Sequence, residues 1–331
     1  MAPAPPPLAQ EVELLVGAGR AADAWRLLNS RAQHGDAEAL FILGSWRLGG
    51  TVVRRDLDAA RTLFGHAAKA GHAEAARAYI AFVGNGTGGP PDWPQALHLL
   101  DALGKADPEL RAELDLIEAM PLSPAGEPLN LRAAELLSER PQVRCIRGFF
   151  SAAECDFLVR TAEPWLTPSV VVDPHSGQMV QNPVRTSDAM VFPWITESPA
   201  VHALNRRIAA ATGTSAAQGE PLQVLRYRSG QQYRPHLDGV AGEVNQRMLT
   251  ALVYLNDGYE GGETTFVKTG LSFRGAKGDA LIFANALPDG RCDNEALHAG
   301  LPVLAGEKYL ASRWIRARPF SFAPPRPLLD I

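Results

Sequence analysis

The sequence contains few cysteines, and their arrangement excludes two common ways of stabilising a small fold. Only Cys145, Cys155 and Cys292 are present, an odd number scattered along 331 residues. A disulfide framework needs paired cysteines, and a thiolate zinc site needs closely spaced ones. We therefore expect reduced thiols with structural or incidental roles, and no catalytic cysteine.

Excess positive charge and long apolar runs are also missing. The formal net charge is -4, so there is no broad basic surface and nucleic acid is not an expected partner. No stretch approaches the ~20 consecutive apolar residues that span a membrane. The start, MAPAPPPLAQEVELL, lacks the basic and apolar segments of a secretory signal. These absences predict a cytoplasmic protein without a membrane partner.

The length is sufficient for two domains, and a repeat occupies the first of them. Glycine recurs at an offset of 36 residues, from Gly35 to Gly71 and from Gly50 to Gly86. Gly-rich turns between apolar segments of helical period are typical of stacked helix pairs, so we predict a short α-solenoid. From about residue 20 to 103 the sequence resembles the Sel-like branch of the tetratricopeptide repeats, which implies a role in protein contact.

The second half of the chain has a different pattern. Residues 120–130 concentrate Pro and Gly, and Ser151 precedes Glu154 with the spacing of a helix capping box. From Leu222 onward, short β-forming segments alternate with turn residues, which favours a double-stranded β-helix, or jelly roll, with flanking helices. The predicted order is a disordered tail at 1–10, a helical repeat domain at 11–120, a linker at 121–140, a β domain at 141–321 and a tail at 322–331.

A possible set of metal ligands lies in this β domain. His236 and Asp238 are two residues apart in a strand-like segment, so both side chains leave the same face. His298 follows 62 residues after His236, on another predicted strand, and a jelly roll can bring such strands side by side. Two imidazoles and one carboxylate bind one triangular face of an octahedral ion, as in non-haem Fe(II) oxygenases. By itself the pair is a weak signal, because H-x-D patterns also arise on solvated strands.

Lys308 strengthens the metal hypothesis. It lies ten residues beyond His298, on the next predicted strand. A lysine beside the metal has a purpose if a dicarboxylate chelates the ion with one end and needs a cation for its far carboxylate. Tyr227 and Tyr254, on neighbouring predicted strands, could donate phenolic hydrogen bonds to the same ligand, although each is equally typical of a core aromatic residue.

Three segments occur in the order found in one enzyme family: RYRSGQQYRPHLDG, then LTALVYLNDGYEGGETTF, then the stretch from GDALIFANALPDG to GEKYLASRWIRAR. Over about residues 143–319 the chain resembles the prolyl 4-hydroxylase branch of the 2-oxoglutarate oxygenases. The resemblance implies that His236, Asp238 and His298 bind iron. It also implies that Lys308 pairs with the C5 carboxylate of 2-oxoglutarate and that Tyr227 helps to bind this cosubstrate.

The same resemblance extends to residues around the expected site. Thr265, in the GGETTF segment, is expected to line the cosubstrate pocket. Arg185 and Ser187, in the VRTSDAM segment, are candidate peptide contacts, and Trp314 is expected in the pocket wall or the core. The implied activity is that of a dioxygenase that uses Fe(II), 2-oxoglutarate, O2 and ascorbate to hydroxylate a prolyl residue of a protein or peptide, with release of succinate and CO2. The helical repeats would present this substrate.

Three alternatives remain open at this point. The same chemistry could act on a free amino acid or another small molecule, with the repeats serving only for docking. The β domain could be a non-catalytic metal-binding scaffold, although the intact ligand set together with Lys308 speaks against this. A zinc or manganese isomerase of the same fold would have no need for a cation at the position of Lys308.

Overall fold

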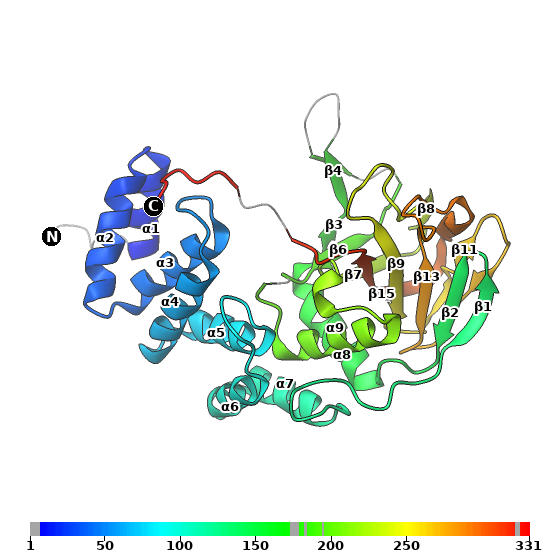
Figure 1. Cartoon of the computed structure of the whole chain (residues 1–331), viewed down its shortest axis with the longest axis horizontal. Coiled ribbons are helices and arrows are strands. Elements are labelled where there is room, and N and C mark those ends of the chain that lie inside the picture. The colour runs from blue at the N-terminus through cyan, green and yellow to red at the C-terminus, as the bar shows by residue number, and fades with distance from the viewer. Residues whose placement is uncertain (1–6, 173–178, 182–183, 194, 322–324) are drawn as a thin grey trace.

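The computed structural model describes residues 7–172, 179–181, 184–193, 195–321 and 325–331. A helical region comes first, and a domain of antiparallel strands with flanking helices follows it (Figure 1). This confirms the predicted order of a helical region before a β domain. Within the described residues, no helix is both long enough and apolar enough to cross a membrane.

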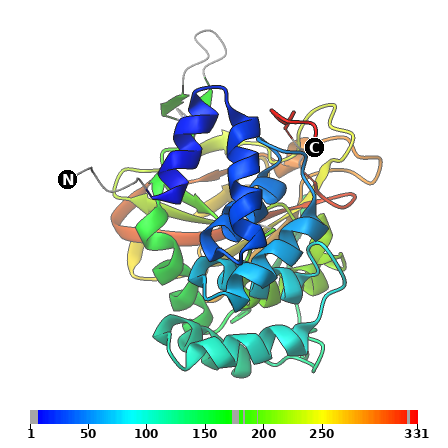
Figure 2. The ribbon, with the colours of Figure 1, turned by 90° about the vertical axis from the view of Figure 1, so that its left-hand side faces the viewer.

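The helices of the N-terminal region pack against their sequence neighbours (Figure 2). Asp36 and Asp56 begin two of them, and each carboxylate accepts a hydrogen bond from a main-chain N–H of the first turn. Helix α1 already begins at Leu8, inside the predicted tail, whose residues 1–6 lie outside the described part. The helices are α1 (Leu8–Gly17), α2 (Ala21–Gln33), α3 (Ala37–Gly49), α4 (Leu57–Lys69), α5 (Ala73–Asn85), α6 (Trp93–Gly104), α7 (Pro108–Glu118), α8 (Ala152–Ala162) and α9 (Pro199–Thr212).

The helix bounds follow the 36-residue offset of the sequence. Helices α3 and α5 begin 36 residues apart, and so do α4 and α6. Gly50 and Gly86 end α3 and α5 with φ of 76° and 80°, a left-handed conformation that favours glycine. The sequence repeat therefore corresponds to two helix pairs in the same frame.

Two sheets form most of the described β domain. A nine-stranded antiparallel sheet has the order β1-β2-β13-β9-β15-β7-β6-β3, with β10 also paired to β15, and a four-stranded sheet has the order β12-β11-β14-β8. Strand β1 lies in the range predicted as a linker, and the strands before Leu222 were not predicted. The strands are β1 (Glu135–Glu139), β2 (Gln142–Ile146), β3 (Thr167–Pro168), β4 (Val170–Val172), β5 (Met179–Gln181), β6 (Asp188–Val191), β7 (Gln223–Arg228), β8 (Tyr233–His236), β9 (Arg247–Tyr254), β10 (Tyr259–Gly261), β11 (Thr264–Phe266), β12 (Ser272–Phe273), β13 (Ala280–Ala284), β14 (His298–Gly300) and β15 (Val303–Arg316).

The large sheet is buried on both faces. On β9, Val253 belongs to the core that includes Leu158 of α8 and Ile208 of α9. The neighbouring Leu252 belongs to a second core, together with Phe266 of the small sheet. Successive residues of a strand point to opposite faces, so helices cover one face of the large sheet and the small sheet covers the other.

The predicted capping box is present at the start of α8. Ser151 Oγ accepts from the main-chain N–H of Glu154 (3.2 Å), and the Glu154 carboxylate accepts from the main-chain N–H of Ser151 (2.7 Å). The same carboxylate accepts two hydrogen bonds of 2.7 Å from Arg207 of α9. Both partners are buried, so this bidentate ion pair ties the flanking helices to each other.

One hydrophobic core joins the helical region to the β domain. Leu100 of α6 and Leu114 of α7 belong to the same cluster as Leu204 of α9 and Val253 of β9. A polar contact supports this junction, because Glu113 of α7 accepts a hydrogen bond of 2.9 Å from the main-chain N–H at the start of α9. Helix α9 thus lies between the helical region and the large sheet.

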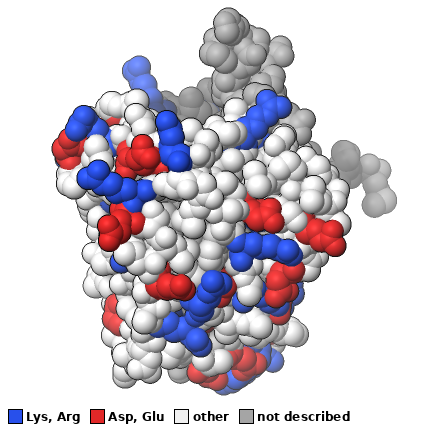
Figure 3. Space-filling model, turned by 90° about the vertical axis from the view of Figure 1, so that its right-hand side faces the viewer, with Lys and Arg blue, Asp and Glu red and all other residues white. Residues whose placement is uncertain are grey.

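Charges of both signs share the surface of the β domain. On the face drawn in Figure 3, acidic and basic side chains are interspersed. This face therefore carries no extended field of one sign.

The shared core predicts that a defect in the helical region destabilises the whole protein. Leu100→Ala should lower the free energy of unfolding by about 2–5 kcal/mol, because it removes buried methyl groups from a core that both parts use. Leu103→Ala, at a position on the same helix that is 36% exposed, is the control and should change stability by about 0.5 kcal/mol or less. Denaturant unfolding followed by circular dichroism and by tryptophan fluorescence should give one common transition. Two separate transitions in the wild type would contradict the shared core.

Candidate functional site

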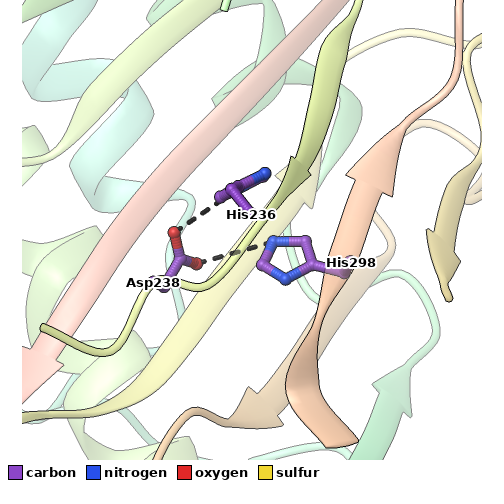
Figure 4. Close-up of side chains that lie close together, drawn as sticks. All are labelled: His236, Asp238 and His298. Atoms are coloured by element: carbon purple, nitrogen blue, oxygen red, sulfur yellow. Dashed lines mark ion pairs between the residues drawn. The ribbon is translucent and has the colours of Figure 1, made fainter. Parts of the chain in front are cut away.

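Two neighbouring strands of the small sheet bring two histidines together. Strand β8 pairs with β14, and the register places His298 opposite His236. Asp238 comes two residues after His236, and the three side chains point toward one another (Figure 4). The Nε2 atoms of His236 and His298 lie 3.5 and 3.7 Å from the carboxylate oxygens of Asp238. A single strand pairing thus unites residues that are 62 positions apart.

Main-chain carbonyls determine how each imidazole faces the site. Nδ1 of His236 lies 2.8 Å from the oxygen of Arg234, and Nδ1 of His298 lies 2.9 Å from the oxygen of Ala296. A carbonyl only accepts, so Nδ1 carries a proton in both rings, and in the neutral form of each imidazole the nitrogen left to bind a metal is Nε2, which faces Asp238. Burial lowers the pKa of His298, which favours the neutral imidazole that binds metals.

A chain of buried polar groups holds Asp238 in place. Thr250 Oγ1 donates to Asp238 Oδ2 (2.6 Å), and Asn285 Nδ2 donates to the same threonine hydroxyl (2.8 Å). Burial alone would raise the pKa of Asp238, but its contacts with the two histidines and with Thr250 outweigh burial, and the carboxyl pKa stays well below its ordinary value. A carboxylate therefore faces the two imidazoles.

This donor set fits an Fe(II) ion. The two imidazole nitrogens and one carboxylate oxygen lie within 4.8 Å of one another. Neutral imidazoles and a carboxylate suit divalent iron, and three donors leave coordination positions for other ligands. The support of each donor by a carbonyl or hydroxyl is the arrangement that orients ligands around protein-bound metals.

A cavity adjoins the three residues, between the two sheets. Its wall contains seven of the residues that the sequence singled out. They come from the β8 and β14 ladder, from β7, from β15 and from the segment before β6: His236, Asp238, His298, Tyr227, Lys308, Trp314 and Arg185.

Lys308 is a buried cation in this wall. Its side chain is 3% exposed, and Nζ donates to the main-chain oxygen of Gly262 (2.7 Å). The ammonium lies over the rings of Tyr227 and Tyr254, at 5.7 and 5.2 Å from their centroids. Burial lowers the pKa of Lys308 to about 7, although the charge of Glu263 acts in the opposite direction. An anion in the cavity would stabilise this desolvated ammonium.

Comparison with known proteins identifies the family. The model of the 2OG-Fe(II) oxygenase superfamily matches residues 222–316. Prolyl 4-hydroxylase 1 of Arabidopsis thaliana is 37% identical over 203 residues, which cover 56% of this chain and 72% of that relative. The chain belongs to the prolyl 4-hydroxylase-like 2-oxoglutarate- and Fe(II)-dependent oxygenases. It is a 2-oxoglutarate-dependent dioxygenase, and Fe(II), 2-oxoglutarate and O2 are its cofactors and cosubstrates, with ascorbate typical of its prolyl-hydroxylating relatives.

Other relatives are similar to the oxygenase over a comparable share of its length. Probable prolyl 4-hydroxylase 3 of Arabidopsis thaliana is 37% identical over 205 residues, which cover 55% of this chain and 71% of that protein. Among solved structures, the viral collagen prolyl hydroxylase of Paramecium bursaria Chlorella virus-1, in complex with 2-oxoglutarate, is 31% identical, with a TM-score of 0.43. The similarity covers 53% of this chain and 96% of that one.

Two residues of the oxygenase that were expected at the cosubstrate pocket lie elsewhere. The hydroxyl of Thr265 lies 2.9 Å from Ser272 Oγ, and the preceding residue, Thr264, lines the cavity instead. Adjacent residues of β11 point to opposite faces of the small sheet, so a prediction that is wrong by one position selects a side chain on the wrong face. Tyr254 is fully buried, and its hydroxyl lies 2.8 Å from Thr264 Oγ1. Its ring lies beside Lys308, but its hydroxyl faces the small sheet.

Ser187 also differs from its expected role as a peptide contact of the oxygenase. It is fully buried and does not line the cavity. Its hydroxyl lies 3.3 Å from Ser169 Oγ, so this side chain belongs to the buried interior of the domain.

Tyr233 is a cavity residue that the sequence analysis missed. Its ring stacks on His236 with a centroid distance of 3.4 Å and an interplanar angle of 12°, and the guanidinium of Arg185 lies 5.7 Å from the same ring. Burial raises the pKa of Tyr233 to about 12, so its hydroxyl remains a hydrogen-bond donor. Strand alternation would not find it, because it lies three residues before His236. Alternation would find Leu225 and Leu310, which lie two residues from Tyr227 and Lys308 and also line the cavity.

The geometry predicts that Asp238 is required for metal binding by the oxygenase. Asp238→Ala should reduce bound Fe(II) by at least about tenfold, because one of three donors and the negative charge are lost. Metal content after anaerobic loading with Fe(II) and gel filtration is the measurement. Asp257→Ala, at an exposed position, is the matched control and should retain wild-type metal content. Equal metal content in the two variants would remove Asp238 from the site.

Proposed function

We propose that this oxygenase hydroxylates a prolyl residue of a protein or peptide substrate and converts 2-oxoglutarate to succinate and CO2. The observation that carries the proposal is the convergence of His236, Asp238, His298 and Lys308 on one cavity. The relatives support the substrate class, because those compared above are named prolyl 4-hydroxylases.

In this proposal His236, Asp238 and His298 hold the iron. When bound, the iron activates O2 together with 2-oxoglutarate and so supplies the oxidising power for attack on a C–H bond. The carbonyls of Arg234 and Ala296 would turn Nε2 of both rings toward the iron, and burial favours the neutral imidazole of His298. Against the effect of burial, the two histidines and Thr250 hold the pKa of Asp238 low, which keeps this third donor ionised.

Lys308 binds the far carboxylate of 2-oxoglutarate. Its ammonium is already desolvated at the cavity wall, and an ion pair there offsets the cost of burying the charge. Tyr227 lies beside it and lines the same cavity, so its hydroxyl is a second donor to the cosubstrate. Burial raises the pKa of Tyr227, and the phenol therefore stays protonated.

Arg185 and Trp314 contact the substrate. Both line the cavity, and the indole Nε1 of Trp314 is buried without a hydrogen-bond partner among the described residues. A donor of this kind suits a main-chain carbonyl of an extended peptide. Arg247, whose guanidinium lies 3.7 Å from the Trp314 ring centroid, holds the indole in position.

The helical region is proposed to be a Sel-like α-solenoid that contacts protein partners. The oxygenase domain, expected over residues 141–321, is proposed to begin at β1, because β1 pairs with β2 in the large sheet. The two helix pairs in a common 36-residue frame support the repeat assignment. The core shared through α9 supports a second role, which is to buttress the large sheet.

Coupled turnover tests the reaction. With Fe(II), ascorbate and air, the purified chain should form succinate and hydroxyproline in equal amounts from 2-oxoglutarate and a proline-rich peptide, measured by mass spectrometry. Asp238→Ala should form neither product above about one hundredth of the wild-type rate. If succinate forms without hydroxyproline, and a free amino acid stimulates its formation, the substrate is a small molecule and not a peptide. If the chain binds iron and 2-oxoglutarate but forms neither product, the result would favour the alternative of a non-catalytic metal-binding scaffold.

Lys308 also predicts a pH dependence of 2-oxoglutarate binding. The cosubstrate needs the ammonium form, whose pKa in the free protein is about 7. Affinity should therefore be highest below pH 7 and fall by about tenfold per unit as the pH rises above it, until the pH reaches the higher pKa of the complex. Anaerobic titrations between pH 6 and 9 measure this. Lys308→Met should bind weakly with a flat profile over that range, and a wild-type slope in this variant would assign the titration to another group.

A further inference from the structure

The two helix pairs share a frame but differ in the loop between their helices. In the second pair the loop contains Gly88, Gly89 and two prolines, as expected for a tight turn. In the first pair the residues at the same positions are Val52 and Val53, followed by two arginines. An apolar pair in a short loop is unusual unless something covers it.

The C-terminal segment of the same chain covers these valines. Val53 is fully buried, and Val52 is 9% exposed. Both belong to a cluster with Ala21, and Leu329 packs against that cluster. Figure 1 shows this segment, in red, beside the N-terminal helices, although it lies at the other end of the sequence. Val16, Trp25 and Trp46, from α1, α2 and α3, also pack against this cluster, and Leu329 is half-buried. We call the cluster of Ala21, Val52 and Val53, together with these three side chains, the socket of Leu329.

Main-chain pairing holds the segment in an extended form. Val53 and Leu329 form a parallel β-bridge. The N–H groups of Leu328 and Leu329 donate to the oxygens of Thr51 (3.0 Å) and Val52 (2.8 Å), and the N–H of Arg54 donates to the oxygen of Ile331 (3.3 Å). These bonds depend on an extended backbone and not on its side chains, as in peptide recognition by strand addition.

Arg47 of α3 fixes the far end of the segment. Its Nη1 donates to the oxygen of Ile331 (2.8 Å) and to the oxygen of Arg54 (3.3 Å), so one guanidinium joins the two paired strands. The guanidinium also lies 5.2 Å from the ring centroid of Trp25, which lines the leucine socket. Arg47 therefore binds the main chain of Ile331, two residues after Leu329.

We propose that residues 51–54, Arg47 and the socket of Leu329 form a docking site for an extended segment of a partner protein, and that residues 328–331 are an internal occupant of this site. The partner carries a leucine at the socket position. An acidic residue after this leucine is favoured, because Asp330 follows Leu329 here and the docking strand carries arginines at 54 and 55.

The contacts indicate that the occupant can be displaced. One leucine enters the socket, Leu328 remains 63% exposed, and Asp330 is exposed. A partner segment that makes the same main-chain bonds competes on equal terms, except that the internal segment benefits from its high effective concentration. This proposal does not rest on the hydroxylation reaction, since the docking site has its own residues and its own ligand.

A labelled heptapeptide with the sequence of residues 325–331 tests the site in the full-length chain. Leu329→Asp should empty the socket and leave the site intact, so this variant should bind the peptide about tenfold or more tightly than the wild type, in which the internal segment competes. Leu328→Asp is the matched control, because the neighbouring leucine is exposed, and it should bind as weakly as the wild type. Fluorescence anisotropy measures the affinities.

Substitutions in the site itself complete the test. In the Leu329→Asp background, Val53→Asp should abolish peptide binding, and Arg47→Ala, at a less buried position, should weaken it by about tenfold while the thermal transition stays unchanged. Equal peptide affinity in the Leu329→Asp and Leu328→Asp variants would overturn the proposal. A wild-type dimer that Leu329→Asp dissociates and Leu328→Asp does not would also overturn it, because the segment would then occupy a second copy.

Discussion

The antiparallel register between β8 and β14 is the constraint on which the candidate active site depends. It sets His298 opposite His236, and the turn after β8 then brings Asp238 against both rings. A slip of one residue would send one imidazole to the other face of the small sheet. The carbonyls that orient the rings belong to residues two positions before each histidine, so the same strand pairing places the candidate ligands and turns Nε2 of both rings toward Asp238.

The large sheet contributes the other half of the cavity because both of its faces are buried. Helices α8 and α9 cover one face, and this leaves the opposite face of β7, β9 and β15 to meet the small sheet. Lys308 stands on that inner face, where apolar neighbours such as Leu225 and Leu310 exclude water. The core that supports this sheet continues through α9 into α6 and α7. The helical region is therefore part of what keeps the cavity in shape, and removing it would test stability as much as recognition.

Sequence patterns were sufficient where one physical rule decides the outcome. The two-residue spacing singled out His236 and Asp238, the ligand chemistry singled out His298, and the capping box gave the start of α8. Strand β8 ends at His236, however, so the turn after it, and not the alternation of a strand, places Asp238. The 36-residue repeat gave the helix pairs and their glycine ends. Position on neighbouring predicted strands singled out Lys308 and Tyr227, the family resemblance implied their roles toward the cosubstrate, and both line the cavity.

The rest depended on long-range pairing that local patterns do not encode. Strand β11 has three residues, too few for its alternation to distinguish Thr264 from Thr265. Tyr254 lies on a strand with two buried faces, so its hydroxyl direction depends on a partner in the other sheet. Ser187 comes directly before β6, which pairs with both β3 and β7, so the direction of its side chain also depends on partners far along the chain. The segment at 325–331, expected to be a tail, is ordered by valines that lie nearly 280 residues earlier in the chain.

The desolvated ammonium of Lys308 has a consequence for how the enzyme distinguishes metabolites. A 2-oxo acid with a single carboxylate could approach the metal ligands, but it would leave this ammonium unpaired in an apolar wall. In the proposed function, rejection of the wrong acid would therefore be a matter of an uncompensated charge and not of steric exclusion. Through this one side chain, the rate of substrate modification would then follow the supply of a dicarboxylic 2-oxo acid in the cell.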